Sequence, residues 1–374
     1  MFDRKNLLLK AKLVAASVIY RRNKRDIPAT VWRNTLRKAM RGLTDTGIEE
    51  FYHVTKAEMD ADIRLLSDTL KPSDDPMDPV LIIVVKDDLV RMKLVYAHYR
   101  RLGVHRFCIL DNGSTDGTLE YVSAQPDTRV YQVATPYINV RKEGWVQYAL
   151  DCLGCDRWYI VVDSDELLDY PGSETHPVQE LIRKQTALGN ERLNGYMVDM
   201  YAAAPLYSVN CEPKDIPKIY CYFDTESYTL GRVLYGRPLP KGGARQRMTG
   251  ISCWAGKCPV FCYRKDTVNI SAHFQYPFAD LTDTNFCTVL RHYKFLGSDK
   301  AVYQKRAERS SGYGATAQEY AAANEFAQKT GGTFLYEASR RYETSASLLQ
   351  LPMLYDTFAH AINPAKLTDE EKEG

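Results

Sequence analysis

The sequence predicts an α/β fold in which a parallel, doubly wound sheet carries a binding site at one edge. Short apolar runs, typical of buried strands, alternate with stretches in which apolar residues recur at helical spacing. Two of the runs end abruptly in acidic side chains, at Asp111 and at Asp163. Because α/β proteins present ligands at the carboxyl ends of their strands, these observations together indicate nucleotide and metal chemistry.

Residues 1–75 are expected to be mostly helical and peripheral, and the turn-rich stretch 71–79 would stop any helix before the sheet begins. From Val80 onward, strands and helices are expected to alternate, with Gly103 terminating the first helix. The expected strands are 80–85, 106–110, 130–133 and 158–162, and the expected helices are 89–102, 115–122 and 142–153. This order and spacing predict parallel strands joined by helices.

The patterns are weaker beyond residue 170. The expected elements are a helix at 178–188, a strand at 195–201, loops with short strands at 205–270 and mostly helix at 284–345, notably 315–329. The charged tail 367–374 is expected to fray. The chain is thus divided into a basic helical extension (1–75), a sheet domain (79–300) and a helical C-terminal region with its tail (301–374).

The composition, 45% hydrophobic and 26% charged over 374 residues, is typical of a globular protein and excludes a disordered or fibrous chain. The nine cysteines form no disulfide framework, and several lie in apolar runs, where a free thiol behaves as a small hydrophobe. Cys152 and Cys155 lack the well-spaced second pair that a structural zinc site needs. These features favour a protein of the reducing cytoplasm.

The N-terminal segment carries most of the positive charge. Residues 1–42 hold 12 basic and two acidic side chains, whereas the remaining chain holds 37 basic and 45 acidic ones. The longest uncharged run in this segment, 13–20, is too short to cross a bilayer. The basic cluster after it argues against a cleaved signal peptide. Residues 1–42 are therefore expected either to contact an anionic membrane peripherally, at its inner face, or to pack as an ordinary helix on the sheet domain.

The strand end Asp163-Ser-Asp-Glu166 is the first candidate metal site. Side chains two residues apart on an extended backbone point to the same side, so Asp163 and Asp165 could share one cation. Mg²⁺ and Mn²⁺ favour such oxygen ligands and complete their coordination with substrate phosphates and water. The alternative is a solvated strand end without a metal.

Asp111 marks the second acidic strand end. It precedes Asn-Gly-Ser-Thr-Asp-Gly, and it lies where an α/β sheet would hold the base or ribose of a nucleotide. The alternative is a purely structural turn in which Ser114 or Thr115 caps the next helix. Neither a dinucleotide-binding glycine pattern nor a P-loop is present, so a nucleotide site here would be of another type.

Three segments, in this order, resemble the family 2 glycosyltransferases, most closely a bacterial branch with an Asp-Ser-Asp-Glu motif. They are Ile-Ile-Val-Val-Lys-Asp-Asp (82–88), Leu-Asp-Asn-Gly-Ser-Thr-Asp-Gly-Thr (110–118) and Val-Val-Asp-Ser-Asp-Glu-Leu (161–167). The resemblance implies a GT-A fold, a mostly parallel Rossmann-like sheet with helices on both faces, over roughly residues 79–300. It also implies a nucleotide-diphosphate sugar donor and Mn²⁺ or Mg²⁺ on Asp163 and Asp165. Asp111 would lie near the base, and Asp87 or Asp88 would line the nucleotide pocket.

Residues farther along the chain would complete this site. The segment 239–247 resembles a Gly-Gly-x-Arg-x-Arg stretch of the same branch, in which Arg245 and Arg247 could clamp a diphosphate through bidentate hydrogen bonds. His292 resembles the late histidine that GT-A enzymes bring to the metal, and His273 is a second candidate for that role. A basic surface loop and structural histidines are the alternatives.

An inverting transfer also needs a general base for the acceptor hydroxyl. The candidates are Asp199, at the end of the strand expected at 195–199, and Asp224 or Glu226. Sequence alone ranks them only weakly, with Asp199 ahead.

The leading hypothesis is transfer of a sugar from a nucleotide-diphosphate sugar to a glycan, lipid-linked or protein acceptor. A sugar nucleotidyltransferase is the first alternative, but such enzymes usually carry a Gly-rich basic loop where this chain reads Lys-Asp-Asp-Leu-Val (86–90). The second is a non-catalytic protein that binds membrane or nucleic acid through residues 1–42. The intact carboxylates at 163 and 165 argue against such a degenerate scaffold, and nucleic acid is not expected as a partner.

Overall fold

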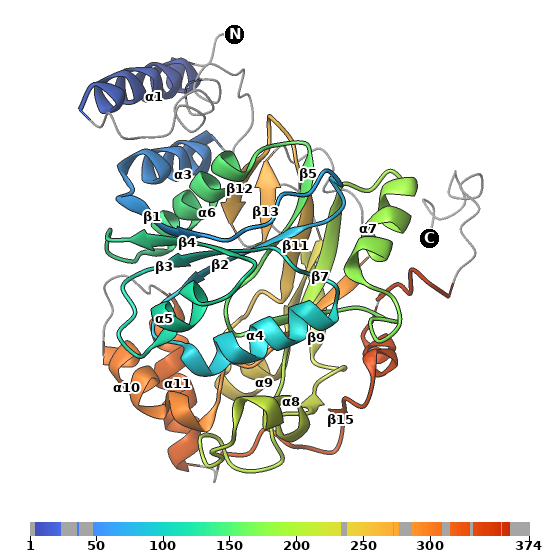
Figure 1. The fold of residues 1–374 in the computed structure, drawn as a ribbon. Coiled ribbons are helices and arrows are strands. Elements are labelled where there is room, and N and C mark those ends of the chain that lie inside the picture. Colours follow the sequence, from blue (N-terminus) through green and yellow to red (C-terminus); the bar gives the residue numbers. More distant parts are fainter. Residues whose placement is uncertain are drawn as a thin grey trace.

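The computed structural model of this protein describes residues 4–23, 36, 48–232, 238–271, 273–276, 286–308, 315–329, 332–352 and 354–359. A nine-stranded sheet forms its centre (Figure 1). The strands lie in the order β1 (Ile63–Asp68), β4 (Thr128–Val133), β3 (Phe107–Asp111), β2 (Val80–Val85), β5 (Arg157–Val161), β11 (Gly256–Tyr263), β7 (Arg192–Asp199), β14 (Phe286–His292) and β6 (Glu166–Asp169). Only β1, β11 and β6 run against the others. The predicted α/β fold with a mostly parallel sheet is confirmed.

Helices cover both faces of the sheet. In β2, Leu81 and Ile83 belong to the same buried cluster as side chains of α4 (Leu89–Arg101), α5 (Thr118–Ser123) and α7 (Val178–Ala187). The alternate residues Val80 and Ile82 pack instead with Trp145 of α6 (Asn139–Leu153). Successive side chains of a strand point to opposite faces, so a strand covered on both sides reads as one continuous apolar run.

Two further helices lie outside α6. Helix α3 (Ile48–Asp60) packs on α6, and α1 (Arg4–Asn23) packs on α3, so that α1 is the outermost layer in Figure 1. The contact between α3 and α6 is unusually close at Gly144, where an added Cβ would lie 2.5 Å from the backbone nitrogen of Glu58. A glycine is therefore required where the two helices cross.

Gly144→Ala is expected to destabilise the protein by roughly 1–3 kcal/mol, because the methyl group would force the α3 backbone away from α6. The sign of the change in unfolding free energy decides the test, because Gly→Ala inside an uncrowded helix stabilises the protein by about 0.5–1 kcal/mol. Urea denaturation of both proteins measures the difference. An unfolding midpoint that rises in the variant would show that the helices do not approach this closely.

The C-terminal half builds a second, smaller layer from α9 (Ala244–Thr249), α10 (Lys300–Glu308) and α11 (Ala315–Lys329), which share a buried aromatic cluster around Phe295 and Tyr303. The remaining elements are α8 (Ile216–Ile219), β8 (Tyr222–Phe223), β9 (Tyr228–Arg232), β10 (Pro238–Gly242), β12 (Val268–Ser271), β13 (Phe274–Tyr276) and β15 (Arg340–Arg341), with 3-10 turns at Pro213–Asp215, Gly297–Asp299 and Ser345–Gln350.

The secondary structure departs from the expectations in three places. Residues 1–75 contain the edge strand β1, residues 205–270 contain the eight-residue strand β11, and residues 284–345 begin with β14 rather than with a helix. All residues of β11 and β14 are buried, including Lys257, Arg291 and His292, so these strands show neither alternation nor an uninterrupted apolar run. The helices near 89–102, 142–153, 178–188 and 315–329 are confirmed. The tail 367–374 lies outside the described residues.

Candidate active site

A cavity of about 970 Å³ lies at the edge of the sheet where β2, β3 and β5 end. The loops after these strands contribute Asp87, Asn112 and Asp165 to its lining. The opposite walls come from α3 and α6 and from the segment around β14, α10 and α11. Ligands of α/β proteins bind in this position, beyond the carboxyl ends of parallel strands.

The register of three neighbouring strands brings Asp199, His292 and Glu166 together. His292 is paired with Asp199 across the parallel strands β14 and β7, and with Glu166 across the antiparallel strands β14 and β6. Paired residues point to the same face of a sheet, so these three side chains become neighbours although they lie far apart in sequence. His292 Nδ1 lies 2.8 Å from Asp199 Oδ1.

The other ring nitrogen of His292 faces Asp165. Nε2 lies 3.1 Å from Asp165 Oδ2. Both neighbours are carboxylates, which only accept hydrogen bonds, so a histidine bonded to both carries protons on both nitrogens. Burial opposes this charge, but Asp165 and Asp199 raise the pKa of His292 above its usual value. Conversely, His292 holds the pKa of the buried Asp165 carboxyl well below its usual value.

In the described part of the chain, Asp165, Glu166 and His292 each offer one possible metal-ligand atom, and these three atoms all lie within 4.8 Å of one another. These three side chains are called the metal group below. Two carboxylates and one imidazole suit a divalent cation. A metal ion would displace the proton from His292 Nε2, and Asp199 would then accept the hydrogen bond of Nδ1, the arrangement that fixes the orientation of histidine ligands in metal sites. The donor set therefore fits a metal ion.

Asp163 has different partners. Lys142 and Lys257 both form ion pairs with its carboxylate, and Lys257 also pairs with Glu166. Burial works against its negative charge, but the two lysines hold the pKa of Asp163 below its usual value. The extended backbone expected across 163–165 is wrong, because β5 ends at Val161 and the N–H of Glu166 turns back to the carbonyl of Asp163 at 3.1 Å.

A chain of ion pairs extends from His292 away from the metal group. Arg245 Nε lies 2.8 Å from Asp199 Oδ1, and Arg245 Nη1 lies 3.1 Å from Glu319. Lys294 reaches the same Glu319 oxygen at 3.0 Å. Arg245, Glu319 and Lys294 line the cavity, whereas Asp199 lies behind them, with 3% of its surface exposed. Asp199 is thus placed to orient His292, with its charge balanced by Arg245.

Arg247, Asp224 and Glu226 lie outside the lining of the cavity. Arg247 Nε is 2.8 Å from the buried carboxylate of Asp224, and its guanidinium stacks on the ring of Tyr336. Glu226 is exposed and lies 3.5 Å from Arg340. The structure therefore separates the two predicted arginines, since only Arg245 reaches the cavity, and it brings neither Asp224 nor Glu226 to it.

The loops that follow β2 and β3 hold each other in place. The fully buried Asp111 accepts hydrogen bonds from the N–H groups of Gly113 and Ser114, at 2.9 and 3.0 Å, and does not line the cavity. Asp87 adopts a positive φ of 49° and accepts a bond from the N–H of Thr115 at 2.7 Å. Asp87 does line the cavity, together with Asp88, which accepts a hydrogen bond from Ser164.

His273 lines the cavity without joining the metal group. Its Nδ1 lies 2.6 Å from the carbonyl oxygen of Gly256, to which it can donate. Burial, aided by the nearby charge of Lys257, lowers the pKa of His273 to about 4. A neutral His273 that bonds the backbone is suited to shaping the cavity wall.

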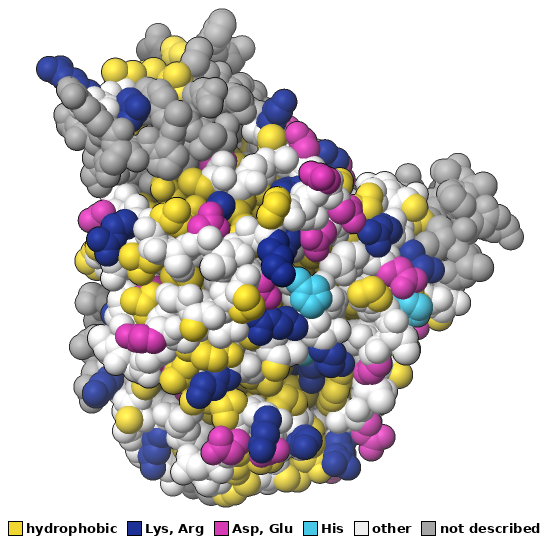
Figure 2. All heavy atoms as spheres, in the orientation of Figure 1, with side chains coloured by type: hydrophobic (Ala, Val, Ile, Leu, Met, Phe, Trp, Pro, Cys, Tyr) yellow, Lys and Arg dark blue, Asp and Glu magenta, His cyan; other side chains and the backbone are white. Residues whose placement is uncertain are grey.

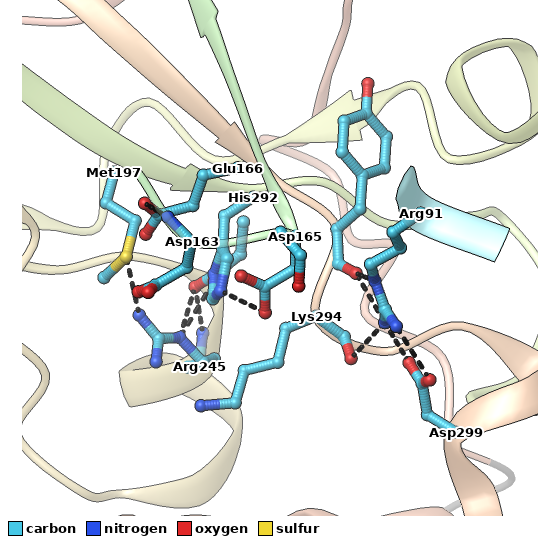
Figure 3. A network of polar contacts seen from close by, with 12 residues as sticks. Arg91, Asp163, Asp165, Glu166, Met197, Arg245, His292, Lys294 and Asp299 are labelled. Atoms are coloured by element: carbon cyan, nitrogen blue, oxygen red, sulfur yellow. Dashed lines mark hydrogen bonds and ion pairs between the residues drawn. The ribbon is translucent and has the colours of Figure 1, made fainter. Parts of the chain in front are cut away.

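Arg91 anchors the wall formed by the segment after β14. It donates to the carbonyl oxygen of Tyr293 and forms an ion pair with Asp88. Figure 3 shows its second ion pair, with Asp299. These bonds connect α4 to Tyr293, the residue that follows His292. They support the histidine in addition to its hydrogen bond with Asp199.

Sequence reasoning missed several cavity residues. Glu166 follows the Asp-x-Asp pair directly, and its place in the motif was a usable signal. Lys142 and Glu143 lie in the expected helix, but nothing local shows that they face the site. Lys257 was hidden because β11 was not expected, and Glu319 because α11 gives no sign of approaching the sheet.

No model of a known protein family matches this chain. The chain is 31% identical over 88 residues to a glycosyltransferase family 92 protein of rice (Oryza sativa subsp. japonica). The matched residues are 23% of this chain and 15% of the rice protein. The similarity to a glycosyltransferase agrees with the expected class of enzyme, while the family 2 branch stays a prediction.

One solved structure with partial similarity is glucosyl-3-phosphoglycerate synthase from Mycobacterium tuberculosis in complex with Mn²⁺, uridine diphosphate and phosphoglyceric acid. It is 14% identical, with a TM-score of 0.23, and the match covers 34% of this chain and 49% of the solved one. This chain thus spans less than two thirds of either protein, and neither match assigns it to a family.

Proposed function

We propose that this protein is a glycosyltransferase of GT-A type that takes a sugar from a nucleotide-diphosphate donor with the help of Mn²⁺ or Mg²⁺. One observation carries the proposal: the ligand atoms of Asp165, Glu166 and His292 lie close enough together to hold a metal ion, inside a cavity at the carboxyl edge of the sheet. The partial similarity to a glycosyltransferase supports the class of reaction. A bound cation would offset the negative charge of the departing diphosphate.

The loops after β2 and β3 are the proposed nucleotide end of the cavity. Asp87, Asn112 and Asp116 line it there and offer carboxylate and amide groups to a ribose or base. A volume of about 970 Å³ lies within the range for sites that bind a small molecule and leaves room for more than a nucleoside. Asp111 contributes indirectly, because it fixes the turn that carries Asn112.

Lys142 and Lys257 are proposed to face the diphosphate. Both line the cavity, and both are held near the metal group by Asp163. Ammonium groups bind phosphate oxygens as point charges, so they add to the stabilisation of the leaving group. Arg245 also lines the cavity, but its guanidinium already forms ion pairs with Asp199 and Glu319.

Glu143 replaces Asp199 as the proposed general base, because Asp199 lies behind the cavity wall and Glu143 lines the cavity. Its carboxylate accepts a hydrogen bond from Asn269 Nδ2 at 2.6 Å. In an inverting transfer the acceptor oxygen attacks the anomeric carbon, the bond to the diphosphate breaks with its electron pair, and the hydroxyl proton passes to Glu143. Burial raises the pKa of Glu143 to about 7, a value suited to proton transfer near neutral pH.

Glu143→Gln is expected to lower kcat by roughly a hundredfold or more and to remove the acidic limb of the pH profile. The carboxylate accepts a proton only when ionised, so kcat of the unmodified enzyme should rise with pH and level off above a pH of about 7. Glu180→Gln on α7, outside the cavity lining, is the matched control. An unchanged acidic limb in Glu143→Gln would exclude this residue as the base.

The proposed function is tested with a panel of UDP-, GDP- and CMP-sugars. The full chain is incubated with each donor, with Mn²⁺ or with EDTA, and both thermal stabilisation and slow donor hydrolysis are recorded. Stabilisation and hydrolysis by one nucleotide class, present only with the metal, is the expected result. A response to no donor, in either condition, would overturn the proposal.

A further inference from the structure

Among the described residues, the packing contacts of helix α1 lie on one side of the helix. Leu13 and Ser17 are buried, with 2% and 0% of their surfaces exposed, and Leu13 packs against Phe51 and Val54 of α3. The same small cluster includes side chains of β12. This contact accounts for one apolar side of the helix.

The other side of α1 is apolar as well, but it is exposed. Leu7, Leu8, Val18 and Ile19 have 63%, 56%, 55% and 60% of their surfaces exposed, the four highest values among large hydrophobic side chains of the described residues. Figure 2 shows hydrophobic side chains at the top of the molecule, where α1 lies. Single exposed leucines are ordinary, but four such side chains on one helix indicate a surface that binds a partner.

The charge of α1 indicates the kind of partner. Arg4–Asn23 contains six basic residues and no acidic residue, and Lys12 and Arg22 are exposed beside the apolar side chains. Basic groups next to an exposed apolar side match an anionic lipid surface, where the leucines enter the interface and the cations meet the headgroups. A nucleic acid would use the charges alone and leave the apolar side chains in water.

A helix bound to lipid in this way would lie along the surface. No helix of the described segments has the length and apolar character needed to cross a membrane. Basic residues at both ends of α1, Arg4 and Lys5 at one and Arg21 and Arg22 at the other, suit a helix that rests in the plane of the interface.

The position of α1 connects this surface to the active site. Helix α1 covers α3, and α3 supplies His53 and Val54 to the wall of the cavity. Among the described elements, α3 thus contacts both α1 and the space in which the reaction is proposed to occur.

We propose that the exposed side of α1 binds the surface of an anionic bilayer and that the sugar acceptor is carried by the lipids of this bilayer. The second half rests on the proposed function. The first half does not, because binding to vesicles is measured without any donor or metal.

The test uses the full chain and sedimentation with vesicles of phosphatidylcholine that contain either no phosphatidylglycerol or 30 mol% of it. Binding to the anionic vesicles, weakened by salt, is expected. The double variant Leu8→Glu/Ile19→Glu should lose at least tenfold in affinity. Leu65→Glu/Leu66→Glu, the same change at exposed leucines of β1, should bind as the unmodified protein does.

Three results would overturn the proposal: no binding to anionic vesicles, equal loss in both double variants, or binding to RNA that is tighter than to vesicles and is lost in the α1 variant. Donor hydrolysis in solution separates this inference from the proposed function. An α1 variant that hydrolyses donor normally but has lost vesicle binding supports both. If the unmodified protein binds vesicles but hydrolyses no donor, the lipid-binding surface of α1 is supported and the lipid-carried acceptor is overturned.

Discussion

Asp165→Asn is expected to reduce metal-dependent donor turnover roughly a thousandfold, which corresponds to about 4 kcal/mol of lost transition-state stabilisation. Asp165 is the carboxylate that faces His292 in the metal group, and its negative charge would attract a divalent cation. The substitution keeps the shape of the side chain, so the fold should be unchanged by circular dichroism. Turnover is measured as kcat/KM over a range of Mn²⁺ concentrations.

Asp156→Asn is the matched control for this experiment. Asp156 precedes β5, the strand whose other end leads to Asp165, and its positive φ of 62° is a conformation that asparagine also tolerates. The control should keep full turnover. Normal turnover in Asp165→Asn would exclude the proposed metal site, and equal losses in both variants would indicate damage to the sheet instead.

Asp199→Asn is expected to weaken Mn²⁺ binding about 10- to 100-fold, because the carboxylate that bonds the second nitrogen of His292 would no longer hold the ring in place. Isothermal titration of Mn²⁺ measures this directly, before any donor is added. The result also distinguishes two roles, since a general base at Asp199 would change kcat and leave the metal affinity untouched.

Asp224→Asn provides the comparison, because the buried Asp224 forms a second carboxylate–arginine pair, with the partly exposed Arg247. Loss of either pair should lower the free energy of unfolding. Only the loss at Asp199 should lower the affinity for Mn²⁺. If both variants bind Mn²⁺ equally well, Asp199 has a structural role alone.

Local patterns were sufficient for the first half of the fold. Apolar runs covered by helices on both faces, such as Val80–Val85, are visible in the sequence because every residue of the strand is apolar. In contrast, β14 carries Arg291 and His292, whose burial depends on Asp169 and Asp199 in the neighbouring strands. No local pattern can reveal a partner that is about 100 residues away, so a strand of this kind escapes prediction.

The same limit applied to the site. Asp165 and His292 were recognised because each lies in a short motif, and the structure brings them together at 3.1 Å. The ion-pair partners of Asp163 are Lys142 and Lys257, which come from a helix before it and a strand after it in the sequence, so no local pattern reveals them. The orienting position of Asp199 depends on strand register, which is a property of the assembled sheet.

The order of the strands has a consequence for the folding of this protein during its synthesis on the ribosome. Strands β5 and β6 are four residues apart in the chain, yet β11, β7 and β14 lie between them in the sheet. Until residues 256–292 emerge, β5 is an uncovered edge whose free backbone groups can pair with another chain. Premature termination before Gly256 should therefore yield chains that aggregate rather than a smaller folded protein.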